Sequence, residues 1–122
     1  MSNSTKTILC VEGQQELAEF ITTVLTNLGY EVVNACSYGL GLVNSLRSSF
    51  DLYIIASELP DGTGAGLCTA IRAHDPQTPI IFTSGGVSPA EIGEAKSAGV
   101  NQILSLPFML AKFENSVIRL LS

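Results

Sequence analysis

The sequence has no tryptophan, a single histidine and few charges, since charged residues make up 14% of its 122 residues. Its six cations stand against 11 acids, for a net charge of −5. They are scattered singly, at Lys6, Arg47, Arg72, Lys96, Lys112 and Arg119. Binding to nucleic acid requires clustered cations that contact phosphates, so the sequence argues against direct nucleic-acid binding.

Long apolar runs are also missing, and none approaches the roughly 20 residues of a membrane-spanning helix. We therefore expect no membrane association. The start, "MSNSTKTILC", holds one lysine and runs directly into a strand pattern, unlike a signal peptide. Cys10, Cys36 and Cys68 are odd in number, widely spaced and form no CxxC pair, which favours reduced thiols over a disulfide or a metal site. Together these features predict a cytoplasmic protein.

Hydrophobic residues make up 46% of the chain, enough for a globular core. The length suits a single domain over residues 1–122, which would bury roughly two-thirds of its unfolded surface. Strand patterns and helical patterns alternate along it without a linker or repeat. Strands are predicted over 6–11, 30–35, from 51 to about 56, 78–84 and 102–106, with helical patterns over 17–28, around 40–46, and over 66–75, 89–98 and 110–121.

Several residues predict where the helices begin and end. Ser88, Pro89 and Glu91 form a capping-box start, and Gly99 suits a left-handed helix end. The second helical pattern has its apolar positions at Leu40, Val43 and Leu46. It also contains Gly39 and Gly41, each costing about 1 kcal/mol relative to alanine, which weakens the prediction over its first turn.

The alternation predicts a doubly wound α/β fold with a five-stranded parallel sheet between two layers of helices. Reactive groups in such folds gather at the carboxyl ends of the strands. The stretch "DLYIIASELPDGTG" ends its strand at Ala56 and Ser57, where such a group would be expected.

The chain resembles the receiver domain of two-component response regulators over nearly its whole length. The resemblance rests on "TILCVEG", "FDLYIIASELPDGTG", "TPIIFTSGG" and "SAGVNQILSLPF". It implies a flavodoxin-like sheet of order 2-1-3-4-5 and a role in phosphorelay signalling. It also implies a cis peptide between Leu106 and Pro107, as in many receivers.

Receivers carry an acidic pair that binds Mg²⁺ after strand one and a phosphoacceptor aspartate at the end of strand three. A hydroxyl residue ends strand four, a lysine precedes the proline after strand five, and an aromatic switch residue lies on strand five. By the resemblance these positions fall on Glu12 and Gly13, Ala56, Ser84, Leu106 and Ile103.

These residues imply a degenerate receiver, which takes no phosphoryl group and is not an enzyme. A methyl group at Ala56 cannot accept a phosphoryl group, and without acids at 13 and 56 we expect Mg²⁺ binding to be weak or absent. Glu12 is the one remnant metal-ligand candidate, although a partly solvated carboxylate is its simpler interpretation. A buried ammonium at 106 would be an unpaired charge, so Leu106 agrees with Ala56.

Neighbouring groups offer no clear replacement. Ser57 should face away from position 56, because strand side chains alternate. Asp61 fits the chemistry of a turn, and His74 is expected to be exposed at a helix end. Glu58 is predicted to approach Glu12 across the mouth of the site.

The leading hypothesis is a phosphorylation-independent interaction module whose partner is a sensor kinase, an output domain, another regulator or a second copy of the chain. The resemblance implies an interaction face on the fourth helix, fifth strand and last helix, at Lys96, Val100, Gln102, Ile103, Ser105, Met109 and Lys112. The alternative is a small-molecule- or ion-sensing domain that uses the emptied pocket around Ala56, Ser84, Gly85 and Leu106.

Overall fold

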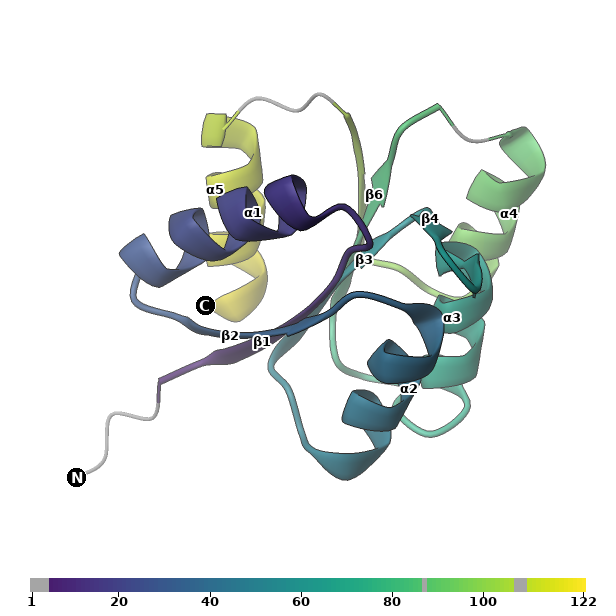
Figure 1. Ribbon diagram of the computed structural model, residues 1–122, viewed down its shortest axis with the longest axis horizontal. Coiled ribbons are helices and arrows are strands. Elements are labelled where there is room, and N and C mark those ends of the chain that lie inside the picture. Colours follow the sequence, from purple (N-terminus) through teal and green to yellow (C-terminus); the bar gives the residue numbers. More distant parts are fainter. Residues whose placement is uncertain (1–4, 87, 107–109) are drawn as a thin grey trace.

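A five-stranded parallel sheet forms the centre of the computed structural model, which describes residues 5–86, 88–106 and 110–122 (Figure 1). The strand order is β2-β1-β3-β6-β7, which confirms the predicted doubly wound topology. The sheet strands are β1 (Thr7–Val11), β2 (Glu31–Ala35), β3 (Leu52–Ala56), β6 (Ile80–Ser84) and β7 (Gln102–Ser105). The helices are α1 (Gln15–Asn27), α2 (Tyr38–Arg47), α3 (Gly64–Arg72), α4 (Pro89–Ser97) and α5 (Leu110–Leu121).

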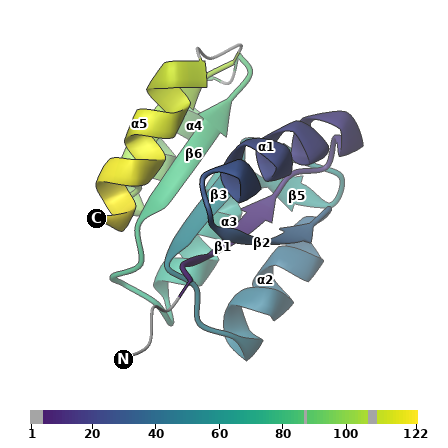
Figure 2. The same cartoon turned by 90° about the vertical axis from the view of Figure 1, so that its left-hand side faces the viewer.

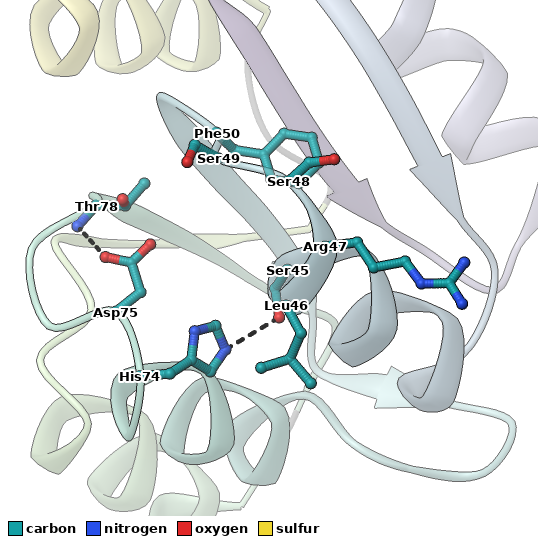
Figure 3. A pocket seen from close by; sticks show the side chains of 9 residues that line it. All are labelled: Ser45, Leu46, Arg47, Ser48, Ser49, Phe50, His74, Asp75 and Thr78. Carbon is teal, nitrogen blue, oxygen red and sulfur yellow. Dashed lines mark hydrogen bonds between the residues drawn. The ribbon is translucent and has the colours of Figure 1, made fainter.

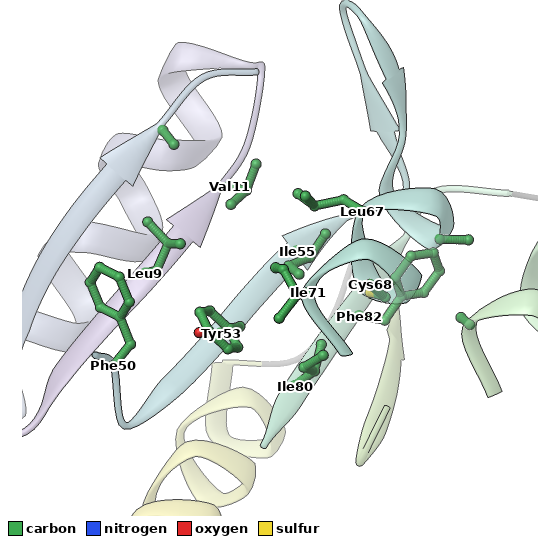
Figure 4. Packing of buried hydrophobic residues seen from close by; sticks show 13 residues of the cluster. Leu9, Val11, Phe50, Tyr53, Ile55, Leu67, Cys68, Ile71, Ile80 and Phe82 are labelled. Carbon is green, nitrogen blue, oxygen red and sulfur yellow. The ribbon is translucent and has the colours of Figure 1, made fainter. Parts of the chain in front are cut away.

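Two helical layers cover the sheet (Figure 2). Because successive side chains of a strand point to opposite faces, Ile8 and Cys10 enter one core while Leu9 and Val11 enter the other. The first core includes residues of α1 and α5, and the second includes residues of α3 and α4 (Figure 4). All five residues of β3 are buried, as its uninterrupted apolar pattern predicts for a central parallel strand.

The residues at the two ends of α4 adopt the capping conformations that the sequence predicts. The Ser88 hydroxyl accepts a hydrogen bond from the Glu91 N–H, and Pro89 is the first residue of α4. Gly99 has a φ of 78°, the left-handed conformation that a residue without a side chain adopts at low cost. Among the described helices, none has the length and apolar character needed to cross a membrane.

The segment after β3 differs from the predicted loop. It forms a small antiparallel ribbon of β4 (Glu58–Leu59) and β5 (Gly62–Thr63), and α3 begins at Gly64, two residues earlier than predicted. Thr63 caps this helix by accepting a hydrogen bond from the Gly66 N–H. A Cβ at Gly64 would lie 1.8 Å from the Ala56 carbonyl oxygen, so only glycine fits where α3 crosses the end of β3.

The helix α2 has two features that its sequence pattern alone did not show. Its first turn is helical despite Gly39 and Gly41, because Ser37 and the carboxylate of Asp61 accept hydrogen bonds from its first N–H groups. Its apolar positions also face outward: Leu40, Val43 and Leu46 are 49%, 42% and 60% exposed. Gly41 and Ser45 face the sheet instead, and a Cβ at Gly41 would lie 2.9 Å from the Val11 side chain.

Candidate functional site at the carboxyl end of the sheet

The carboxyl ends of β1, β3, β6 and β7 surround a small cavity of about 100 Å³. Glu12, Ala56 and Leu106, three of the positions predicted from the resemblance, lie together in its lining. The complete lining consists of Glu12, Gln14, Leu17, Ala56, Ser57, Glu58, Thr83, Gly85 and Leu106. The methyl group of Ala56 therefore stands where the resemblance places the acceptor carboxylate.

Two predicted positions, Gly13 and Ser84, are not among the described residues that line this cavity. Gly13 lines a neighbouring cavity of about 410 Å³ between α1 and the end of β2. A Cβ at Gly13 would lie 3.0 Å from the Cδ of Pro60, so a larger side chain would require that proline to shift. Ser84 is 6% exposed, and its carbonyl accepts a hydrogen bond from the Leu106 N–H at 2.7 Å.

Thr83 is a lining residue that sequence reasoning missed. It pairs with Ala56 in the β3–β6 ladder and is 2% exposed, which brings a hydroxyl residue beside the alanine. The register of the two strands is the signal that could have identified it. Ser57 also lines the cavity; its backbone N–H donates to the Thr83 carbonyl at 2.8 Å, and its own carbonyl accepts from the Gly64 N–H at 2.9 Å.

Glu12 is the buried carboxylate of this site, with 6% of its surface exposed. Its Oε2 accepts a hydrogen bond from the Gln14 N–H at 3.0 Å. Burial raises the pKa of Glu12 above its usual value, and backbone hydrogen bonds from Gln14 and Gly13 offset part of this shift. Glu58 lines the same cavity, as the sequence predicts, but its residue is exposed.

These side chains do not fit a Mg²⁺ site. The described residues contain no group of three or more histidine, cysteine, aspartate or glutamate side chains placed to hold a metal ion. Mg²⁺ demands near-octahedral oxygen coordination, whereas Ala56 and Leu106 present hydrocarbon to this cavity. We therefore derive no metal-dependent step for this chain.

Asp61 lies outside the cavity and has a role that the sequence assigned only to a turn. Its Oδ1 accepts a hydrogen bond from the Tyr38 N–H at 2.7 Å, and its Oδ2 accepts from the Gly39 N–H at 3.0 Å. These bonds lower the pKa of Asp61, led by the one from Gly39. Asp61 therefore caps α2 and joins the β4–β5 ribbon to that helix.

A second, polar cavity of about 380 Å³ lies near the amino ends of β3 and β6 (Figure 3). His74 lines it and is exposed, as expected, but its Nε2 lies 3.2 Å from the Ser45 hydroxyl. That hydroxyl donates its proton to the Leu42 carbonyl at 2.7 Å, so it accepts from a protonated Nε2 of His74. The Asp75 carboxylate beside it accepts from the Thr78 N–H at 3.1 Å.

The predicted interaction face lies on α4, β7 and α5. Lys96, Ser105 and Lys112 are exposed, while Gln102 is half-buried and accepts a hydrogen bond from the Arg119 guanidinium. Val100 and Ile103 are partly buried against the core, which makes them poorer contact residues than expected. Met109, with Pro107 and the peptide bond before it, lies outside the described residues. Only Ala95 of α4 is buried.

The response regulator receiver domain family matches residues 8–118, and the chain belongs to this family. Receiver domains are signalling modules that interact with kinases or output domains. Among curated proteins, the chain is 31% identical over 103 residues to the transcriptional regulatory protein CssR of Bacillus subtilis strain 168. It is 33% identical over 101 residues to the response regulator ArlR of a Staphylococcus epidermidis strain.

These matches cover 84% and 83% of this chain but 45% and 46% of the relatives, so the chain spans less than half of their length. Among solved structures, a CheY-like receiver domain protein from Methanospirillum hungatei JF-1 has a TM-score of 0.93 at 24% identity, covering 97% of this chain and 94% of that one. CheY4 of Vibrio cholerae has a TM-score of 0.88 at 24% identity, covering 96% and 99%. At this identity the likeness establishes the fold.

Proposed function

We propose that this receiver domain takes no phosphoryl group and acts as a phosphorylation-independent protein-interaction module in two-component or phosphorelay signalling. The observation that carries the proposal is Ala56 at the end of β3, in the wall of the carboxyl-end cavity. Phosphoryl transfer to a side chain requires a nucleophile, and a methyl group has none.

The other residues of the cavity support the same interpretation. In the family, a lysine at position 106 would offset the charges of the phosphoryl group and the acids. Here Leu106 lies in a cavity whose acceptor position is already uncharged, so a cation there would have lost its partners. Substitution of both positions is consistent with a site that no longer accepts a phosphoryl group.

The size of the cavity argues against the alternative, a small-molecule-sensing domain that uses the emptied pocket. About 100 Å³ is well below the roughly 300–1,000 Å³ of ordinary ligand pockets. The cavity therefore has room for water and little more.

We assign the output to the face formed by α4, β7 and α5, with a sensor kinase, an output domain or another regulator as the partner. Lys112 and Arg119 line a groove of about 430 Å³ beside β7, which is an edge strand of the sheet. Ala95 is the one buried residue of α4, so most of the surface of this helix is accessible to a partner.

Two-dimensional NMR of the domain with beryllofluoride or acetyl phosphate and Mg²⁺ tests this proposal. We expect the amide signals of Glu12, Ala56 and Ser84 to stay unchanged, while a receiver with an intact acceptor aspartate, treated in parallel, shifts. Saturable shifts at these three residues, or an acid-labile phosphate adduct by mass spectrometry, would contradict it. A thermal-shift screen of small molecules tests the alternative, since a ligand of the folded state raises the melting temperature.

A further inference from the structure

The outward face of α2 is apolar although the fold does not require it to be. Leu40, Val43 and Leu46 recur every three residues on a ten-residue helix, and each is more than 40% exposed. In Figure 2, α2 lies at the periphery of the molecule, next to the edge of the sheet that ends in β2. We call these three side chains the α2 stripe.

The helix cannot rotate to bury the stripe. Gly41 and Ser45 fit it closely onto the sheet, and even one added carbon at Gly41 would lie 2.9 Å from Val11. A leucine or valine turned toward the sheet would collide with β1. The stripe therefore contributes little to the packing of the described residues, and its exposed apolar surface could be buried by another molecule, at a gain of roughly 25 cal/mol per Å².

The charges at the two ends of α2 are opposite. Arg47 is the only charged residue of the helix and lies at its carboxyl end, where Figure 3 shows its side chain extending away from His74 and Asp75. At the amino end, the exposed carboxylate of Asp61 lies against Gly39, whose Cβ would be 3.5 Å from Oδ2. Position 39 shares a helix face with positions 43 and 46, so this carboxylate borders the stripe.

We propose that the α2 stripe is the contact surface of a symmetric dimer, in which α2 packs antiparallel against α2 of a second copy. A two-fold axis through Val43 places position 40 opposite 46 of the other copy, and position 47 opposite 39. Each leucine then meets a leucine, and each Arg47 meets the Asp61 carboxylate at the other copy's Gly39. Such a contact is isologous, as two-fold symmetry requires.

This self-complementarity selects a second copy as the occupant. The apolar positions and the two charges match when the same helix is reversed about its centre, so a second copy supplies both the apolar and the charged complement. The contact is separate from the α4–β7–α5 face and goes beyond the proposed function. It is also small, since a ten-residue helix provides much less than the roughly 1,200–2,000 Å² of a standard interface, so we expect a weak dimer.

Sedimentation equilibrium of the full chain, from about 10 μM to 1 mM, tests the dimer. We expect concentration-dependent association with a dissociation constant in the range of about 0.1–1 mM, which is typical of a small contact. Val43→Glu and Arg47→Glu should each weaken it at least tenfold, and Arg47→Glu should lose its effect in high salt. Ile118→Glu is the matched control, because Ile118 is an equally exposed apolar residue on α5 (44% against 42%).

Cysteine crosslinking tests the register. In a Cys36→Ser background, which removes the one exposed cysteine, Val43→Cys lies on the two-fold axis and should form disulfide dimers when oxidised with copper phenanthroline. Leu46→Cys should crosslink far more slowly alone and quickly when mixed with Leu40→Cys. Equal rates for Val43→Cys and Leu46→Cys would overturn the register. A chain that stays monomeric throughout, or an Ile118→Glu variant that dissociates as Val43→Glu does, would overturn the dimer.

Discussion

The polar side chains at the two ends of the central sheet differ in how extensively they are hydrogen-bonded. At the amino end, the Asp75 carboxylate accepts hydrogen bonds from the Tyr53 hydroxyl at 2.8 Å and from the Thr78 N–H. Arg72 beside it donates to four backbone carbonyls and one side chain, which ties α3 to the turns before β6 and β7. At the carboxyl end, Glu12 is the buried acid among the described lining residues, and the backbone N–H groups of Gln14 and Gly13 donate to its carboxylate.

This contrast shows that the two ends of the sheet use their charged side chains for different purposes. The hydrogen bonds at the amino end stabilise the fold, because they fix how α3 and α4 pack against the sheet. The carboxyl end is the family's reactive end, and the resemblance places Ala56 and Leu106, which line the cavity there, at positions where the family carries ionic groups. We therefore expect that replacing the hydrogen-bonded polar residues at the amino end lowers the free energy of unfolding. At the carboxyl end, we expect that introducing a charge lowers it.

The largest effect is expected for Arg72→Ala. The substitution removes five hydrogen bonds and leaves the carbonyls of Thr78 and Ala98 without their guanidinium donor. We expect a loss of about 3 kcal/mol in the free energy of unfolding, since a hydrogen bond to a charged donor is worth roughly 1.5–3 kcal/mol and these bonds are part-buried or exposed, so their contributions do not add in full. Urea denaturation measures it.

Arg47→Ala is the control, because the Arg47 side chain is exposed and should contribute less than about 0.5 kcal/mol in the monomer. Protein concentrations below the dimer range keep the comparison free of association. Equal losses for the two arginines would contradict the structural role of Arg72.

A smaller loss is expected when the acceptor charge is restored by Ala56→Asp. The new carboxylate would be buried beside Glu12, with no cation among the described residues that line the cavity, at a cost of about 2 kcal/mol. If Ala56 and Leu106 changed together for electrostatic reasons, adding Leu106→Lys should recover part of the loss. A double-mutant cycle by urea denaturation should then give a favourable coupling of at least about 0.5 kcal/mol between the two sites. Additive losses would show that charge compensation does not explain Leu106.

The sequence predicts the fold well because the relevant signals are local or periodic. The apolar pattern of β3, the Ser88–Pro89 helix start and the glycine at 99 each specify structure through their immediate neighbours. The helix α2 shows the limit of periodicity. An apolar stripe predicts a buried face, but the contact between Gly41 and Val11, distant in sequence, decides which face meets the sheet.

The candidate site was predicted in part. The resemblance led to Glu12, Ala56 and Leu106, which the strand ends bring together. It could not reveal Thr83, whose place depends on the register between β3 and β6, nor the capping of α2 by Asp61, which joins residues more than 20 positions apart. Such contacts depend on how elements dock, which no local pattern encodes.

The smallest effect, and the sharpest test of the carboxyl end, is expected for Glu12→Gln. Burial raises the pKa of the folded-state carboxyl, so its ionised form is less favourable in the folded chain than in the unfolded one. The ionised carboxylate therefore lowers stability above the folded-state pKa, and this penalty disappears below the ordinary glutamate pKa. Glutamine keeps an oxygen for the Gln14 N–H and carries no charge. We expect a modest rise in melting temperature at pH 7 that disappears near pH 4.

Thermal melts between pH 4 and pH 8 measure this difference, with the exposed Glu31→Gln as the control that should show no such trend. A decrease in the melting temperature of Glu12→Gln at pH 7, instead of a rise, would also be informative. If Glu12→Gln lowered the melting temperature at pH 7 only when Mg²⁺ is present, the carboxylate would be stabilised by that cation in the folded chain. The carboxyl end would then retain part of the family's metal site, and the contrast between the two ends of the sheet would not hold at Glu12.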